Sequence, residues 1–448
     1  MAVAAGVCLV LAALSLLLPW WPSYDPFAWL VFGRELVDPG LGFSTIAHTG
    51  WKPLPVLFTA PFGLFGAAAP RLWLLVVRAS GLAALALAYR LGARSRGPAA
   101  GGVAALALLL SADWLRYLSA GNVEAMAIAS LLGAVELHLQ RRRGWAFLLG
   151  TLTGLARPEI WPLLGVYGLY LWRVEGRRWP LFVALPAMVA LWVLPDWAGS
   201  GQLFHTFHSA TISGEPKQIR DTAHPALELS GRALGILVAP VWIGALVGAV
   251  YGWRTRDRAA LAVTVAALAW FVVTIGGEAI GYPAVPRYLV EPAALCCVLA
   301  GIGIVWCARL PAAAAPRLAL IGLLVAACVP FVVARADGLQ RQASAATARG
   351  RATTGLWRVV DRARAVKPVA GRVPLVAPGV QSTALAWKLR VKLTGVAQTG
   401  GRRTTIAFAQ GDQPTLAPLR RAGATFTPFA SAGSWSALEV HWPAPSPA

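Results

Sequence analysis

The sequence predicts an all-α polytopic membrane protein with about eleven transmembrane helices and additional interfacial helices, followed by a small α/β domain. Of the 448 residues, 57% are hydrophobic and only 13% are charged, whereas soluble domains carry roughly 25% charged residues. Apolar runs recur along the chain between short charged loops, as expected of helices that cross a bilayer. Many of the 20 tryptophans stand at the ends of these runs, where membrane interfaces concentrate them.

Eleven apolar runs are predicted to span the membrane. The first run lacks the basic start and small-residue cleavage site of a removable signal peptide, so we expect it to be retained. The run at 54–66 is too short to cross at 1.5 Å per residue, and we interpret it as a re-entrant or interfacial helix. The expected spans are 3–20, 72–91, 101–118, 122–139, 145–156, 158–172, 179–195, 234–252, 259–276, 288–308 and 316–334.

The spans 145–156 and 158–172 lie between two basic loops, so together they must cross the membrane and return. Both are short, and they meet at Arg157 and Pro158. Irregular backbone at membrane depth persists only where it is buried in protein or lines a cavity. We therefore expect the turn around Arg157 and Glu159 to form part of a pocket wall.

Charge divides the predicted loops into two sides. The positive-inside rule places the arginine clusters in the cytoplasm, and most acidic residues then fall on the outer side. The arginine clusters lie at 90–96, 141–143, 173–178, 254–258 and 309–317. This topology predicts a membrane domain at 1–334, with a first outer loop at 21–71 and a large outer loop at 196–233.

The remaining residues, 335–448, contain no apolar run long enough to span a membrane. They are predicted to form a basic extracytoplasmic α/β domain. They carry 16 Lys and Arg against 4 Asp and Glu, which is +12 of the net charge of +21. Such a domain suits an anionic glycan or lipid head group, or it reflects a generally arginine-rich composition without a specific partner.

Several functional classes are not supported by the sequence. The five cysteines fall in or beside apolar runs without metal-binding or redox spacing, which is typical of small core residues. There is no phosphate-binding glycine loop in a strand-turn-helix context, no internal repeat and no coherent nucleic-acid-binding patch. We expect membrane lipid among the partners and no nucleic acid.

The stretch "SYDPFAWLVFGREL" (23–36) places Asp25 directly after the first span, between Tyr24 and Pro26. A carboxylate that is partly desolvated at a membrane surface has a raised pKa and is a stronger base. Pro26 suits the first turn of a helix, which here would be amphipathic and interfacial. The alternative is that Asp25 only caps this helix.

Five blocks of the sequence, in this order, resemble the GT-C superfamily of membrane glycosyltransferases, which use sugars linked to lipid phosphates. Bacterial mannosyl-, arabinofuranosyl- and protein O-mannosyltransferases are of this kind. The blocks cover roughly residues 1–305, and the first has Gly33 at a position where the family carries a small residue. They are "YDPFAWLVFGREL" (24–36), "WKPLPVLFTAPFGLFG" (51–66) with its continuation "APRLWLLVVRASGLAALALAYRL" (69–91), "SAGNVEAMAIASLLGAVELHL" (119–139), "GLARPEIWPLLG" (154–165) and "VPRYLVEPAALCCVLAGIGI" (285–304).

The resemblance implies a GT-C-like fold and an inverting displacement. Asp25 would deprotonate an acceptor hydroxyl, which attacks the anomeric carbon of a sugar on a polyprenyl phosphate, while Glu124 would assist the base or orient the acceptor. Cations would stabilise the leaving phosphate. The candidate cations are Lys52, Arg287 and Arg157. The candidates for substrate binding are Tyr24, Trp29, Trp51, Glu159 and Tyr288.

Each of these groups also has a purely structural interpretation. Lys52 and Arg287 would equally suit interfacial positions from which they reach the lipid head groups. Arg157 would suit a buried ion pair with Glu159, and the aromatic residues would suit membrane-interface anchors.

No cofactor is expected. Many relatives carry paired acids in the first outer loop, whereas Asp25 stands alone, with Glu35 and Asp38 a turn or more away. A divalent metal is therefore possible but not supported by a paired acidic motif. The motif "HTFH" (205–208) offers two histidines in the large outer loop, but a metal there would need a third ligand supplied by the fold.

The expected partners are a polyprenyl-phosphate-linked sugar, such as mannose or arabinofuranose, and an envelope glycan, lipid or protein acceptor. The expected location is the bacterial plasma membrane, with the active site on the extracytoplasmic side. Two alternatives remain open. One is a transporter or flippase of lipid-linked intermediates, which would favour inverted repeats that are not visible here. The other is a non-catalytic envelope scaffold, for which Asp25 would be dispensable.

Overall fold

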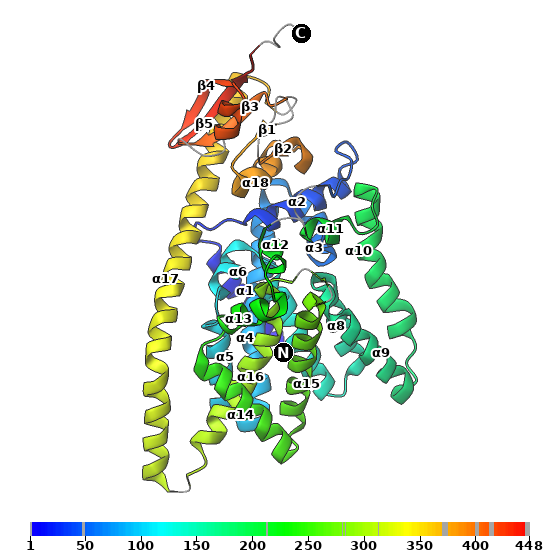
Figure 1. The fold of residues 1–448 in the computed structure, drawn as a ribbon, viewed down its shortest axis with the longest axis vertical. Coiled ribbons are helices and arrows are strands. Elements are labelled where there is room, and N and C mark those ends of the chain that lie inside the picture. The colour runs from blue at the N-terminus through cyan, green and yellow to red at the C-terminus, as the bar shows by residue number, and fades with distance from the viewer. Residues whose placement is uncertain are drawn as a thin grey trace.

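The computed structural model describes residues 2–46, 50–211, 214–279, 281–282, 284–311, 313–369, 375–398, 403–411 and 416–443. Within these ranges the chain forms a bundle of helices with a small domain of strands and helices at one end (Figure 1). The expected fold class is confirmed, since apolar helices make up the bundle and the strands are confined to the C-terminal part of the chain.

The expected spans coincide with helices of the bundle. Among the described residues, five segments are long and apolar enough to cross a membrane by themselves. They contain α4 (Ala69–Arg96), α10 (Leu185–Ser200), α15 (Arg258–Ala279), α16 (Val290–Ala308) and α17 (Ala314–Val366). Four expected spans are shorter helices of 14 to 16 residues, about 21–24 Å long at 1.5 Å per residue. They are α1 (Ala2–Ser15), α7 (Glu124–Leu139), α8 (Arg143–Ala156) and α9 (Trp161–Glu175).

Two expected spans are bent rather than straight. The span predicted at 101–118 consists of α5 (Pro98–Leu109) and α6 (Trp114–Ala120), which meet at 66°. Asp113 precedes α6 with a φ of 62°, and this left-handed conformation redirects the chain. The span predicted at 234–252 corresponds to α14 (Ala239–Thr255), which meets the preceding α13 (Pro225–Leu234) at 101°.

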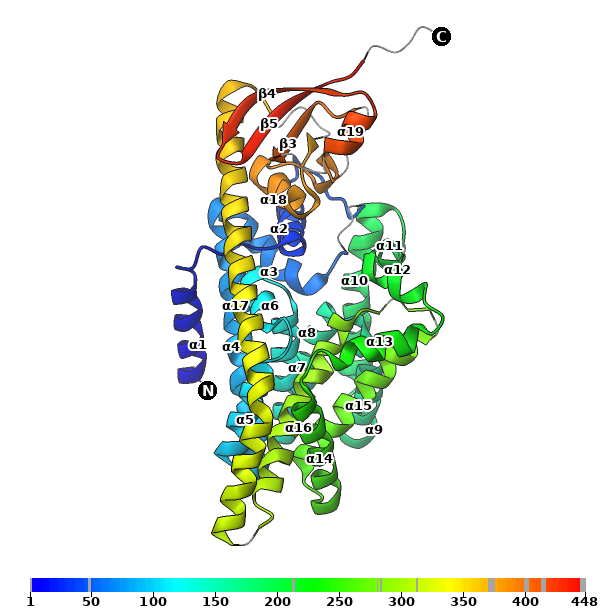
Figure 2. The same ribbon diagram turned by 60° about the vertical axis from the view of Figure 1, so that its left-hand side comes forward.

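Helix α16 lies inside the bundle and packs against α14, α5, α15 and α4 (Figures 1 and 2). Its crossing with α14 depends on glycine, because a Cβ at Gly303 would lie 2.1 Å from the carbonyl oxygen of Gly244. Every residue from Val290 to Gly303 is buried. As a result, α16 carries its one acidic residue, Glu291, into the interior of the protein.

Acidic residues among the arginine-rich loops form ion pairs with those arginines. Glu136 on α7 accepts hydrogen bonds from Arg90 at 2.9 Å and from Arg94 at 3.2 Å. Glu175 pairs with Arg143 and, at 2.8 Å, with Arg177. These contacts offset part of the positive charge at this end of the bundle.

Two short helices, α2 (Tyr24–Val37) and α3 (Pro53–Gly63), lie near the end of the bundle that faces the strands (Figure 1). The 11 residues of α3 extend about 17 Å, which is too short for a span and agrees with the interpretation of 54–66. The two helices cross closely at Gly33, where a Cβ would lie 2.4 Å from the carbonyl carbon of Thr59. The Thr59 hydroxyl also donates a hydrogen bond to the carbonyl oxygen of Trp29 at 2.7 Å.

The last helix of the bundle continues directly into the C-terminal domain. Helix α17 has 53 residues, about 80 Å, and runs without a break through the boundary expected at 334/335 (Figure 2). The five-stranded sheet has the order β2-β1-β3-β5-β4, in which β1 is parallel to β2 and β3 and the other pairs are antiparallel. Its strands are β1 (Leu375–Val376), β2 (Val396–Ala397), β3 (Ile406–Gln410), β4 (Thr425–Ala432) and β5 (Trp435–His441). The domain also contains α18 (Gly379–Leu389) and α19 (Ala417–Arg421).

Helix α2 connects the bundle to this domain through Arg34. The buried Arg34 guanidinium donates hydrogen bonds to the carbonyl oxygens of Trp387 at 2.8 Å and Val391 at 3.0 Å, and it lies 4.8 Å from the Trp387 ring. Burial lowers the pKa of Arg34 to about 10, with the charge of Arg390 acting in the same direction. This contact fixes the C-terminal domain over α2 and its Asp25.

Candidate active site

The carboxylate of Asp25 lies in the first turn of α2 and does not cap the helix. The N-cap residue is Ser23, whose backbone N–H donates to the carbonyl of Ala120 at 2.8 Å. The Ser23 hydroxyl donates to the side-chain carbonyl of Asn122 at 3.1 Å. These bonds tie the start of α2 to the α6–α7 loop and leave the Asp25 side chain for other contacts.

Asp25 forms an ion pair with Arg287, which stands 262 residues later in the chain. Arg287 belongs to the short helix η4 (Pro286–Leu289) at the start of α16, and its Nη1 donates to Asp25 Oδ2 at 3.4 Å. Both side chains are about one-third exposed, at 30% and 38%. The fold therefore brings the expected base next to one of the expected phosphate-binding cations, in a long, half-exposed contact.

Arg157 lies deeper and is enclosed by carboxylates. Its Nη2 donates to Glu124 Oε1 at 2.9 Å, and its Nε donates to Glu291 Oε1 at 2.7 Å. All three side chains are at most 2% exposed. Arg157 also donates to the carbonyl oxygen of Arg287 at 3.3 Å, so the buried cluster holds the backbone of the residue that contacts Asp25.

The expected ion pair between Arg157 and Glu159 is replaced by the pairs with Glu124 and Glu291. Glu159 is buried and accepts a hydrogen bond from the Tyr282 hydroxyl at 3.1 Å. The buried turn that carries these residues is η2 (Pro158–Ile160), with Arg157 as its N-cap. The turn is buried, and Glu159 contacts a tyrosine rather than the arginine. Neither Arg157 nor Glu159 lines the cavities described below, so the expected place of this turn in a pocket wall stays a prediction.

Tyr288 lies between the two arginines. Its ring centroid is 4.8 Å from the guanidinium carbon of Arg157 and 5.7 Å from that of Arg287. Such cation–π contacts favour the charged form of both arginines and hold them in place. Tyr288 therefore supports the cations of the site in this structure.

Lys52 belongs to the same electrostatic group. It is the N-cap residue of α3, and its Nζ lies 5.8 Å from the centroid of the Trp29 ring. Burial lowers the pKa of Lys52 to about 7, and the positive charges of Arg157 and Arg287 add to this effect. The lysine is thus poised to gain or lose its charge near neutral pH.

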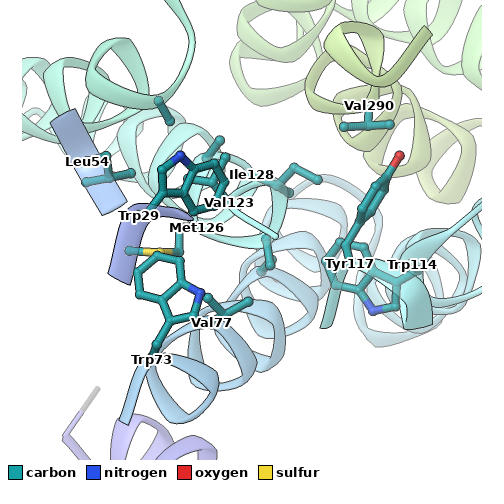
Figure 3. Packing of buried hydrophobic residues seen from close by; sticks show 14 of the residues in the cluster. Trp29, Leu54, Trp73, Val77, Trp114, Tyr117, Val123, Met126, Ile128 and Val290 are labelled. Atoms are coloured by element: carbon teal, nitrogen blue, oxygen red, sulfur yellow. The ribbon is translucent and has the colours of Figure 1, made fainter. Parts of the chain in front are cut away.

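The two tryptophans expected at a substrate surface are instead packed in the core. Trp29 is 2% exposed and packs edge-on against Trp73, with ring centroids 6.0 Å apart (Figure 3). Trp51 is 3% exposed, and its indole N–H donates to the carbonyl of Leu191 at 3.0 Å. Because α2 and α3 pack tightly on the bundle, the rings of both residues face its interior rather than an open surface.

Tyr24 does lie at a cavity. A cavity of about 620 Å³, here called the Asp25 cavity, lies between the start of α2 and the C-terminal domain. The Tyr24 hydroxyl accepts a hydrogen bond from Gln398 at 2.7 Å, which links it to that domain. The charged residues that line the cavity are Asp25, Arg116, Arg287 and Arg349.

A second cavity of about 660 Å³, here called the α6–α13 cavity, lies on the other side of Arg116 and Arg287, which line both cavities. Its wall includes residues from α6, α13 and η4. Its other charged lining residues are Asp113, Glu215 and Arg232. The Asp25–Arg287 pair therefore stands at the junction of two solvent-accessible spaces.

Sequence reasoning assigned no role to three residues of this site: Arg116, Arg349 and Glu291. Glu291 had a usable signal, because an acidic residue inside a predicted span is costly and is commonly paired. Arg116 and Arg349 resemble ordinary surface arginines in the sequence. Only the packing of α6 and α17 next to α2 brings them to the Asp25 cavity.

Among the described residues, the histidine motif has no third metal ligand beside it. The ring of His205 on α11 (His205–Thr211) contacts Gln202 at 3.5 Å, and nearby Asp196 accepts two hydrogen bonds from Thr206. Within the part of the chain that the structure describes, no three His, Cys, Asp or Glu side chains are grouped as a metal ion would require.

The comparisons with known proteins identify the fold. No family model and no curated protein sequence matches the chain. Among solved structures, ArnT from Cupriavidus metallidurans bound to undecaprenyl phosphate superposes with a TM-score of 0.55 at 16% identity, over 98% of this chain and 97% of ArnT. The apo state of the same protein gives 0.54 at 16% identity, over 98% of each chain. The chain therefore has the GT-C fold that its sequence blocks resemble.

Proposed function

We propose that this protein is an integral membrane glycosyltransferase that transfers a sugar from a polyprenyl-phosphate donor to an envelope glycan, lipid or protein. The fold is shared with ArnT over nearly the whole of both chains, and ArnT was solved with undecaprenyl phosphate bound. The large apolar helices supply the membrane setting in which such a donor resides. The arginine-rich loops support an orientation in which Asp25 and the C-terminal domain face the extracytoplasmic side.

The single observation that carries this proposal is the Asp25–Arg287 pair at the junction of two cavities. A carboxylate can act as a general base only if the group that it deprotonates can reach it, and Asp25 lines an open cavity. The neighbouring arginine provides charge for a phosphate. The two cavities would let acceptor and donor approach this pair from different sides.

The proposed reaction is an inverting displacement. The acceptor enters the Asp25 cavity, and Asp25 takes the proton of its hydroxyl while the oxygen attacks the anomeric carbon. The bond between this carbon and the phosphate oxygen breaks, and polyprenyl phosphate leaves with the electron pair. Arg287, with Lys52 close by, stabilises the negative charge on the leaving phosphate.

The buried cluster acts through Arg287. Because both sides of the Arg157 guanidinium are occupied by Glu124 and Glu291, we assign Arg157 and Glu124 a positioning role rather than direct contact with substrate. Arg157 holds the carbonyl of Arg287 and thereby the start of α16. Glu159 and Tyr288 support the same turn.

The test uses protein in nanodiscs with radiolabelled polyprenyl-phosphate sugars offered one at a time, including mannose and arabinofuranose, together with an envelope extract as acceptor source. Wild type should release polyprenyl phosphate. Asp25→Asn should lower this rate by about 10²–10⁴, the usual contribution of a general base. Asp38→Asn, which removes a carboxylate at the other end of α2, is the matched control and should retain the rate.

The alternatives predict different results. A transporter or flippase would move the lipid-linked sugar between leaflets without releasing polyprenyl phosphate. A scaffold would show no turnover with any donor, and Asp25→Asn would then have no consequence. Equal turnover by wild type and Asp25→Asn would remove Asp25 from the proposed mechanism.

A further inference from the structure

The C-terminal domain contains a second cleft, here called the arginine cleft, which the reaction proposed above does not use. It has a volume of about 630 Å³ and lies between α17 and the turn that joins β4 to β5. Its basic residues are Arg351, Arg358 and Arg362, which all project from α17. The opposite wall includes Ser434 and Trp435.

Small residues keep the floor of this cleft open. On α17, Ala352 and Gly355 lie between Arg351 and Arg358, and Ala348 lies one turn before Arg351. Gly355 allows a close contact with the sheet, because a Cβ there would lie 2.7 Å from the Trp435 ring. The helix and the β4–β5 turn can therefore approach each other at Gly355 while space remains beside it.

The arginine cleft has positive charge, and none of its lining residues in the described part of the chain is acidic. Arg351 and Arg358 are exposed and form no ion pair or hydrogen bond with any other described residue. Arg362 donates one hydrogen bond, to the carbonyl oxygen of Ser431. Asp361, on the same helix, is already paired with Lys388 at 2.7 Å. Two guanidinium groups are therefore available for an anion.

The cleft adjoins the Asp25 cavity. Ala348, Ala352 and Gln410 line both spaces. Residues 348–362 of α17 cover roughly 21 Å along the helix axis. A chain-like molecule that lies along this face would reach from the arginine cleft to Asp25.

We propose that the arginine cleft is a subsite for an anionic glycan, which forms the part of the acceptor that extends away from the reacting hydroxyl. Its negative groups would be carboxylates or phosphates, both of which fit the forked guanidinium of Arg351 or Arg358. The cleft favours a glycan over acyl chains because it lies in the C-terminal domain and is lined largely by arginine and small residues. This inference rests on the proposed function, since it names the acceptor class of the same site.

The test is a binding measurement on the full-length protein in uncharged nanodiscs, without donor. The fluorescent probes are an octamer of galacturonate (carboxylates), an oligomer of glycerol phosphate (phosphates), a neutral maltooctaose and a short DNA strand. We expect one of the first two to bind saturably and more tightly than the neutral glycan or DNA. The double variant Arg351→Gln/Arg358→Gln should weaken this binding about 10-fold. The matched control Arg403→Gln/Arg421→Gln, which removes two exposed arginines of the same domain, should change it less than 2-fold.

The outcomes separate this inference from the proposed function. If polyprenyl-phosphate release is intact but neither anionic glycan binds, or if both double variants weaken binding equally, the arginine cleft is not a glycan subsite. Equal binding of DNA would reduce it to a general polyanion surface and would also overturn the inference. If the anionic glycan binds but no donor is turned over, this result contradicts both the role of the glycan as acceptor and the proposed function. Faster donor turnover in the presence of the bound glycan, lost in Arg351→Gln/Arg358→Gln, would support both.

Discussion

Two ion-pair systems lie next to each other at this end of the bundle, and they differ in burial and in the number and length of their contacts. Arg157 is 1% exposed and makes two contacts below 3 Å with Glu124 and Glu291. Asp25 and Arg287 are about one-third exposed and share one contact of 3.4 Å. The two systems are connected, since Arg157 also donates to the carbonyl oxygen of Arg287.

The difference indicates which system is suited to chemistry. The side chains of the buried system are at most 2% exposed, so a substrate does not reach them in this structure, and breaking their contacts leaves charges without water. A half-exposed pair contributes about 1 kcal/mol or less to stability, so a substrate can displace it at small cost. In the sequence, all of these residues look alike, as charged groups near an outer loop. Only their burial in the structure distinguishes the supporting cluster around Arg157 from the Asp25–Arg287 pair.

The largest effect should come from breaking the buried system. Arg157→Met leaves Glu124 and Glu291 without their cation, and we expect a loss of about 3–5 kcal/mol in stability. Thermal unfolding in detergent measures this loss. Arg232→Met, which breaks a pair on the exposed surface, is the control and should leave the unfolding temperature nearly unchanged. Equal shifts in the two variants would mean that the buried cluster is not a structural support.

Removing Arg287, the cation of the exposed pair, should lower activity strongly while changing stability little. The free energy of unfolding of Arg287→Gln should lie within about 1 kcal/mol of that of wild type. It should lower kcat/KM for the lipid-linked donor about 10- to 100-fold, because a charge-assisted contact to phosphate is worth about 1.5–3 kcal/mol. Steady-state kinetics with purified donor provide the measurement. Loss of folding without a specific donor effect would place Arg287 with the buried system instead.

Lys52 should make donor binding at the exposed pair depend on pH. Since its pKa lies near 7, its charge is present at pH 6 and largely lost at pH 8.5. Donor binding by wild type should therefore weaken by up to about 10-fold over this interval. Lys52→Arg stays protonated and should bind donor equally at both values. If both proteins show the same pH dependence of the donor Kd, the titrating group is not Lys52.

The buried carboxyl group of Glu35 should make the stability of the protein depend on pH. Burial raises its pKa from 4.5 to about 7, and a hydrogen bond from the Ser44 backbone N–H at 3.2 Å only partly opposes this. Because the folded pKa is the higher one, the stability linked to Glu35 is full below pH 4.5 and is lost as the pH rises through 7. Glu35→Gln should match the stability of wild type near pH 4.5 and exceed it at pH 8. A variant that is less stable than wild type at pH 8 would contradict this sign.

Much of the fold could be predicted from local sequence. Apolar runs located the helices of the bundle, and the short run at 54–66 indicated a helix that cannot span, which α3 is. The prediction failed where chain direction depends on one residue, as at Asp113, because a left-handed φ has no signature in hydrophobicity. The boundary expected at 334/335 reflects a change in composition, whereas the backbone of α17 continues through it.

The sequence by itself determined that the chain is a helical membrane protein with an acidic residue directly after its first apolar run, since hydrophobicity and charge are local properties. Tertiary structure alone decided which charges meet. Arg157 pairs with residues 33 and 134 positions away, and Arg287 with one 262 positions away. The same packing buries Trp29 and Trp51 and brings Arg116 and Arg349 to Asp25. Ion-pair partners and burial depend on which helix faces pack together, and no spacing within one segment encodes that choice.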